Sequence, residues 1–286
     1  MTVKDRLPVT ITKAIDFLTR NRNELIKRFS GSAGEERDLV IEELKQAIER
    51  LSELRYELVT DKQLRPVGDS FVDADHWNRL LEKLRSSEGD DDCTWFRAPW
   101  LFTECYMYRR IHEAMRLCKS ALRGYDPFEQ AKIESHELSL ANMSGIIKIL
   151  CPLDYEQEEK DAQVQMSRFK MIVQAQLWAN KNDLSLSSGE DVSSKVKNLV
   201  SLIDSLQSNV LCDHLDELWQ FLLKLNEDRK EEKKKKIRID IALDNCAIEL
   251  TADLILCDFL LRNNLADQIC LHGKLFSWFI SDVSRI

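Results

Sequence analysis

A short alternating segment that leads directly into an apolar helix constrains the fold of this chain most strongly. Residues 237–243 place isoleucine or leucine at every second position, with Arg238 and Asp240 between them, which is the pattern of a half-buried strand. The stretch that follows, as far as Leu261, carries apolar residues at helical spacing, and residues 267–272 form a second apolar segment. We therefore predict a βαβ unit with parallel strands and a right-handed crossover.

The sequence before this unit predicts one helix after another. Two apolar stripes at helical spacing, containing Ile11 and Leu18 in one and Leu44 and Leu51 in the other, indicate bundle core. Further helices are predicted from Pro99 onward and over 74–86, 128–149, 157–179, 192–208 and 213–228. The predicted organisation is an all-helical domain over 1–228, a charged linker over 229–236 and an α/β domain over 237–286.

Composition excludes several classes of protein. The net charge of −8 argues against a general nucleic-acid binder, which usually presents a basic surface. The longest apolar run is too short to cross a bilayer, and the N-terminus lacks an apolar signal core. Eight cysteines without a close pair fit a reducing compartment. We expect a soluble cytoplasmic protein without nucleic-acid or membrane partners; the lysine run at 233–236 keeps the nucleus as an alternative location.

Oxygen-bearing side chains are concentrated where the first strand ends. Asp244 and Asn245 follow the strand, and Glu249 lies in the first turn of the next helix. Open α/β sheets place their ligands at the carboxyl ends of strands, which makes this a candidate binding site. A purely structural interpretation stays open, because Asp and Asn also favour helix N-caps.

Several motifs in order along the chain carry a family resemblance. They include ECYMYRRIHEA at 104–114, LWANKNDLSLS at 177–187, LDN at 243–245 and WFISD at 278–282. With these motifs the chain resembles the damage-control phosphatases built on domain of unknown function 89, in the branch called sugar-phosphate phosphatases or acidic residue methyltransferases. The resemblance implies an all-helical region followed by a Rossmann-like α/β domain, with a metal at the junction.

The resemblance also implies a site and an activity. Asp244, Asn245 and Asp282 would ligate a divalent ion such as Mn²⁺, Ni²⁺, Co²⁺ or Mg²⁺, and carboxylate and amide oxygens suit such hard cations. Asp244 and Asn245 would also bind substrate and take part in catalysis. The implied reaction is hydrolysis of small phosphomonoesters, with fructose 1-phosphate and fructose 6-phosphate as the expected substrates and a small phosphorylated metabolite as the partner.

Two other functions follow from the same sequence. Some members of the family are described as S-adenosylmethionine-dependent methyltransferases of protein glutamate side chains, and Glu249 and Asp282 would then bind the cofactor. We rank this second, because the chain has no glycine-rich cofactor loop. The third hypothesis is a non-catalytic helical protein that retains the family scaffold.

The chain departs from the family pattern in two places. The motif Asp-Asn-x-Gly-x-Glu has Ala247 at its glycine, and a methyl group there either crowds a ligand or is tolerated in a helix. Family members also continue well past the equivalent of Asp282, with further strands and cationic segments that contact the phosphate, whereas four residues follow Asp282 here. We therefore expect an incomplete, truncated α/β domain and little or no activity from this chain.

Overall fold

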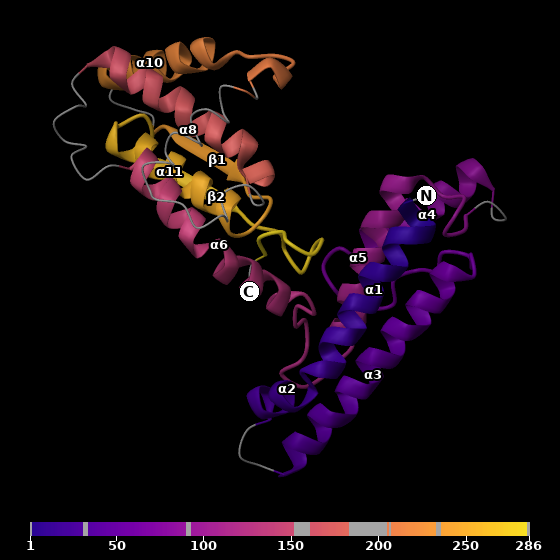
Figure 1. Cartoon of the computed structure of the whole chain (residues 1–286). Helices are drawn as coiled ribbons and strands as arrows, with labels where there is room; N and C mark the ends of the chain where they lie inside the picture. Colours follow the sequence, from indigo (N-terminus) through magenta and orange to yellow (C-terminus); the bar gives the residue numbers. More distant parts are fainter. Residues whose placement is uncertain are drawn as a thin grey trace. The chain divides into compact units, whose positions relative to one another are not determined.

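The computed structural model describes residues 2–30, 34–89, 93–151, 161–182, 205, 207–232 and 236–284. The chain forms two compact units, which can be followed by colour in Figure 1. The first, called here the helical unit, comprises residues 1–130 and 275–280; the second, called here the sheet unit, comprises residues 131–274 and 281–285. This division falls at Gln130, within a helix, and so differs from the predicted domain boundary at 229–236.

The helical unit contains long helices connected by short segments. Their bounds are α1 Thr2–Arg20, α2 Arg22–Phe29, α3 Gly34–Val59, α4 Ala74–Glu88 and α5 Trp100–Arg116. The helices α1, α3 and α5 pack against one another, and α2 packs against α1 and α3. The helix predicted from Pro99 is confirmed as α5, with Pro99 as the residue that precedes its first turn.

Both predicted apolar stripes lie in the core of the helical unit. Ile11 and Leu18 of α1, and Leu44 and Leu51 of α3, are fully buried. Because residues three and four positions apart share one face of a helix, this spacing gave the buried faces correctly. Arg109 of α5 is also fully buried in this unit, and its guanidinium donates hydrogen bonds to Asp69 and Asp73 at 2.7–3.1 Å.

The sheet unit combines helices with the predicted strand, helix and strand. Its elements are α6 Glu129–Leu150, whose first two residues fall in the helical unit, α8 Ala162–Asn182, η2 Gln207–Asn209, α10 Leu215–Glu232, β1 Arg238–Ala242, α11 Ile248–Arg262 and β2 Gln268–His272. The predicted helices at 128–149, 157–179 and 213–228 correspond to α6, α8 and α10. The helix predicted over 192–208 falls largely outside the described residues.

Part of the predicted linker is helical. Residues 229–232 continue α10, whereas residues 233–235 lie outside the described chain. Arg229 fixes this end of the helix, because its guanidinium donates to Asp267 Oδ1 at 2.7 Å and to the carbonyl of Asn264 at 3.1 Å. Local charge density suggested a solvated segment and gave no sign of these distant partners.

The strands β1 and β2 pair in parallel, as predicted, and lie side by side in Figure 1. The register places Ile239 opposite Ile269 and Ala242 opposite His272. Burial alternates along β1, with Ile239 and Ile241 half-buried between exposed neighbours. The described chain is therefore mostly helical with a small two-stranded parallel sheet, which agrees with the predicted α plus α/β class at this coarser level.

Aromatic side chains from three helices form the centre of the sheet unit. Phe169 of α8, Trp219 of α10 and Phe259 of α11 are buried, with ring centroids 5.3–6.3 Å apart. Side chains of α6, α8, α10 and α11 belong to this one hydrophobic core, and α11 packs mainly against α8. Over the described ranges, no helix has both the length and the apolar character needed to cross a membrane.

Candidate functional site

Two loops at the carboxyl end of the sheet bring the predicted site residues together. One loop follows β1, and the other contains residues 281–284. The Cys246 amide donates a hydrogen bond to the Ser281 carbonyl at 2.8 Å, and the Val283 amide donates to the Asp244 carbonyl at 2.7 Å. Asn245 and Asp282 form an antiparallel bridge between them. Asp282 lies about 40 residues after Asp244 and Asn245 in the sequence, and the three residues are therefore neighbours only in the folded chain.

A lysine ammonium lies between the two carboxylates of this site. Lys274 Nζ is 3.6 Å from Asp244 Oδ1 and 3.3 Å from Asp282 Oδ2, and it donates a hydrogen bond to the Leu243 carbonyl at 2.7 Å. Asp244 is exposed, whereas Asp282 is buried. The aspartates therefore share one cation, which the chain itself supplies.

Asn245 connects the loop to the first turn of α11. Its Nδ2 donates to Glu249 Oε2 at 2.9 Å and more weakly to Asp244 Oδ2 at 3.3 Å, while its Oδ1 accepts a hydrogen bond from Ser281 Oγ at 2.5 Å. These bonds fix the orientation of the amide and place Glu249 next to the pair formed by Asp244 and Asn245. The two predicted cofactor contacts have different partners: Glu249 accepts a hydrogen bond from Asn245, and Asp282 forms an ion pair with Lys274.

Burial perturbs two carboxyl groups near this end of α11. The pKa of Asp282 is raised to about 6, mainly because the carboxyl is removed from water and also because of the charge of Asp244, while Lys274 opposes both effects. Burial also raises the pKa of Asp253, which accepts a hydrogen bond from Gln176 of α8. Carboxyl groups with pKa values raised by burial are typical of sites that bind cations or move protons.

The residue at the family glycine position has an unusual backbone conformation. Ala247 directly precedes α11 with φ 62° and ψ −117°, a combination that favours glycine over residues with a side chain. Its carbonyl accepts the Thr251 amide at 2.9 Å and so begins the helix. Ala247 therefore lies before the helix and not within it, and its backbone conformation is strained for an alanine.

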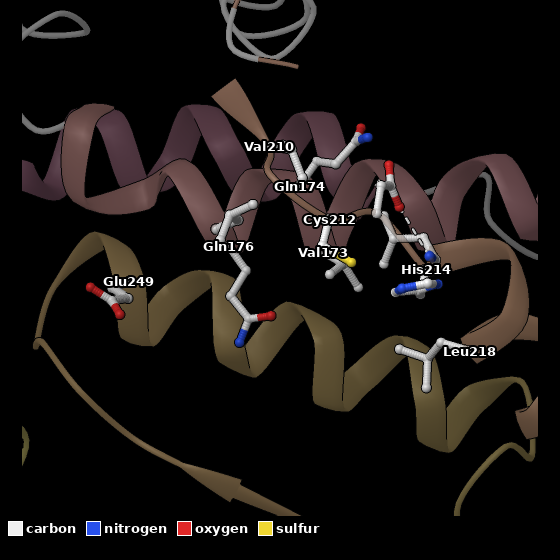
Figure 2. Close-up of a pocket in the computed structure, with 11 residues that line it drawn as sticks. Val173, Gln174, Gln176, Val210, Cys212, His214, Leu218 and Glu249 are labelled. Carbon is white, nitrogen blue, oxygen red and sulfur yellow. Dashed lines mark hydrogen bonds between the residues drawn. The ribbon is translucent and has the colours of Figure 1, made fainter. Parts of the chain in front are cut away.

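A pocket of about 600 Å³ begins at Glu249 and extends between α8 and the start of α10 (Figure 2). Glu249 lies at one end of the view, and His214 and Leu218 lie at the other. Aliphatic side chains form much of the lining, which comprises Val173, Leu177, Val210, Leu215 and Leu218 together with Gln174, Gln176, Cys212, Asp213, His214 and Glu249. Its volume is within the range of ligand pockets.

The structure brings together the three predicted metal ligands and adds residues that the sequence did not single out. Within the described ranges, no three His, Cys, Asp or Glu side chains are grouped as a metal site; the predicted set has two carboxylates and an amide. Lys274, Ser281 and Gln176 were missed as site residues. The Gly273-Lys274 turn directly follows β2, so its position at the same sheet edge as Asp244 was the available signal for Lys274.

Comparison with known proteins gives a consistent family. The model of the damage-control phosphatase ARMT1-like domain matches residues 2–285. The chain is 41% identical to damage-control phosphatase ARMT1 of Mus musculus over 287 residues, 42% to that of Rattus norvegicus and 39% to that of Homo sapiens over 286 residues each. These alignments cover 99–100% of this chain and 62% of each relative. The chain thus spans about three fifths of their length, and it belongs to the damage-control phosphatase ARMT1-like family.

Proposed function

We propose that this chain provides the metal-binding edge of a phosphatase that hydrolyses small phosphomonoesters. The observation that carries the proposal is the convergence of Asp244 and Asp282 on a single cation, the Lys274 ammonium, at the carboxyl end of a parallel sheet. Membership of a phosphatase family supports phosphate ester chemistry. Fructose 1-phosphate and fructose 6-phosphate are the substrates we propose from the sequence.

The donor set fits a hard divalent cation. The carboxylates of Asp244 and Asp282 already surround a positive charge, and the Asn245 amide oxygen retains a second lone pair beside its bond from Ser281. We propose Mn²⁺ as the ion, with Ni²⁺, Co²⁺ and Mg²⁺ as alternatives. When bound, such an ion polarises a phosphoryl oxygen and lowers the pKa of a coordinated water.

The protein groups around the ion would orient the Asn245 ligand and stabilise the negative charge of the phosphate. Ser281 and Glu249 bind opposite ends of the Asn245 amide and so prevent it from rotating. The helix α11 begins at Ile248, directly after this loop, and a helix N-terminus favours an anion by roughly 0.3–1 kcal/mol. We propose that the pocket beginning at Glu249 accepts the organic part of the ester.

A matched pair of aspartate variants tests this function. Phosphate release from fructose 1-phosphate would be measured with and without Mn²⁺ for the 286-residue chain, Asp244→Ala and Asp240→Ala. Asp240 is a suitable control, because it is exposed on β1 and contacts Arg238 and His272. We expect Mn²⁺-dependent release that Asp244→Ala abolishes and Asp240→Ala retains. Equal release from the wild-type chain and Asp244→Ala would refute the proposal for this chain.

The two other hypotheses stay predictions. For methyl transfer to protein glutamate side chains, Glu249 and Asp282 would need to contact S-adenosylmethionine, and calorimetric binding of that cofactor to the wild-type chain and to Glu249→Ala tests this. For a non-catalytic interaction protein, neither metal-dependent hydrolysis nor cofactor binding is expected. The contacts between Asp244, Asp282 and Lys274 favour the phosphatase, since they gather oxygen ligands around a cation.

A further inference from the structure

Lys274 is held in the candidate site from both its backbone and its side chain. Its amide donates to the Val283 carbonyl at 2.8 Å, and the residue forms a parallel bridge with Ser284. Its ammonium bonds the Leu243 carbonyl and lies 3.3 Å and 3.6 Å from the carboxylates of Asp282 and Asp244. Three oxygen atoms from two loops therefore surround this one nitrogen.

This arrangement is that of a cation surrounded by its ligands. The ammonium donates one hydrogen bond, to the Leu243 carbonyl, and forms ion pairs with both aspartates, while a buried carboxylate such as Asp282 needs a counter-charge. A divalent ion bound to both carboxylates would occupy the same space as the ammonium at these distances. The positive charges would also repel each other strongly in a partly buried site.

We propose that Lys274 is a built-in counter-cation that occupies the metal position when the protein is metal-free and must leave it when the metal binds. The inference rests on the proposed function, because it takes Asp244 and Asp282 as ligands of the ion. Lys274 has the means to move: its side chain is one-third exposed, and the lysine stem is flexible. The lysine thus stabilises the metal-free loops and lowers the affinity for the metal.

Removal of the charge tests the competition. Mn²⁺ affinity would be measured by calorimetry for the wild-type chain, Lys274→Met and the control Lys230→Met, which removes an exposed lysine from α10. We expect Lys274→Met to bind Mn²⁺ about tenfold more tightly than the wild type, because no ammonium has to be displaced. Lys230→Met should keep the wild-type affinity. Thermal unfolding should show a lower Tm for metal-free Lys274→Met and a larger rise on addition of Mn²⁺.

The outcomes separate this inference from the proposed function. If Mn²⁺ binds neither the wild type nor Lys274→Met, the metal site itself is refuted. If the wild type binds Mn²⁺ and Lys274→Met binds it equally or more weakly, Lys274 is not a competitor, whereas the metal site stands. A tenfold gain shared by Lys230→Met would be a general charge effect and would also overturn the inference.

A measurement on the wild-type chain keeps the inference testable if Lys274→Met does not fold. The acetylation rate of each lysine would be followed by peptide mass spectrometry with and without Mg²⁺. Displacement frees the ammonium from its carboxylates, so acetylation of Lys274 should accelerate severalfold with Mg²⁺ while that of Lys230 stays constant. An unchanged or slower rate at Lys274, at Mg²⁺ concentrations where calorimetry shows binding, would contradict displacement.

Discussion

At the scale of single residues, Ala247 shows how a substitution at one position affects a site. The alanine has φ 62° and ψ −117° and lies between Asp244–Asn245 and the first turn of α11. Backbone conformations that favour glycine cost a residue with a side chain about 1–3 kcal/mol. The turn before α11 therefore forms at an energetic cost to the stability of this chain.

Restoring glycine should relieve this strain. We expect Ala247→Gly to raise the free energy of unfolding by about 1 kcal/mol, since relief of the strained φ exceeds the added flexibility of the unfolded chain. Urea denaturation measures the change. The control is Ala252→Gly, in the interior of α11 and also buried, which should lower stability by at least about 1 kcal/mol. Similar losses in both variants would show that Ala247 is unstrained.

His112 provides a second prediction at this scale, concerning pH. Its ring is buried, stacks on Phe276 with centroids 4.2 Å apart, and has no hydrogen-bond partner on either nitrogen in the described chain. The pKa of His112 is lowered to about 3, mainly by burial and also by the nearby charge of Arg109. The unfolded histidine, with a pKa near 6.5, binds a proton more readily than the folded one.

The contribution of His112 to stability is therefore complete above pH 6.5 and is lost as the pH falls toward 3. We expect a loss of about 1.4 kcal/mol for each pH unit below 6.5 from this group alone. His112→Phe should flatten the dependence of the unfolding free energy on pH between 6.5 and 4.5. His76→Phe, at an exposed position, should leave it unchanged. A slope that His112→Phe does not reduce would show that the ring is protonated in the folded protein.

At the scale of elements, the helices determine the surroundings of the site. The Phe169, Trp219 and Phe259 rings join α8, α10 and α11, and Gln176 of α8 donates to Asp253 of α11. The pocket that begins at Glu249 lies between α8, the start of α10 and α11 (Figure 2). Glu249 thus lines the pocket and also accepts a hydrogen bond from Asn245.

A thiol in the lining reports on the pocket. Of the eight cysteines, all within the described residues, Cys212 is the exposed one. We expect Val173→Trp, which places an indole in the pocket, to slow alkylation of Cys212 by about three- to tenfold through steric exclusion. Mass spectrometry of the labelled peptide measures the rate. The control is Leu138→Trp, at an exposed position of α6 that does not line the pocket. Equal rates of Cys212 alkylation in both variants would show that the pocket does not govern access to this thiol.

At the scale of the whole molecule, the sequence predicted what depends on local pattern and failed where distant partners decide. Periodicity gave the stripes of α1 and α3, the parallel strands and the loop with Asp244. It could not show how the helices pack on one another, and in the structure α8, α10 and most of α6 group with the strands. For the same reason Lys274 was overlooked, because its role depends on oxygens from two separate loops.

Each unit has a core of its own, which leads to a prediction for the whole chain. Leu51 lies in a core formed by residues of the helical unit, and Phe259 lies in a core formed by residues of the sheet unit. Truncation of either side chain to alanine removes buried apolar contacts and should cost about 2–5 kcal/mol. Because the two cores share no residue, we expect each variant to affect mainly the unit that contains it.

Amide hydrogen exchange followed by mass spectrometry distinguishes the two units. Leu51→Ala should accelerate exchange in α1, α3 and α5, and Phe259→Ala should accelerate it in α8 and α11, with smaller changes elsewhere. Leu138→Ala, at a largely exposed leucine, should change neither group. An equal acceleration of both groups by either core variant would show that the chain unfolds as one cooperative structure. The expected pattern would instead allow the candidate site to be studied through the stability of the sheet unit alone.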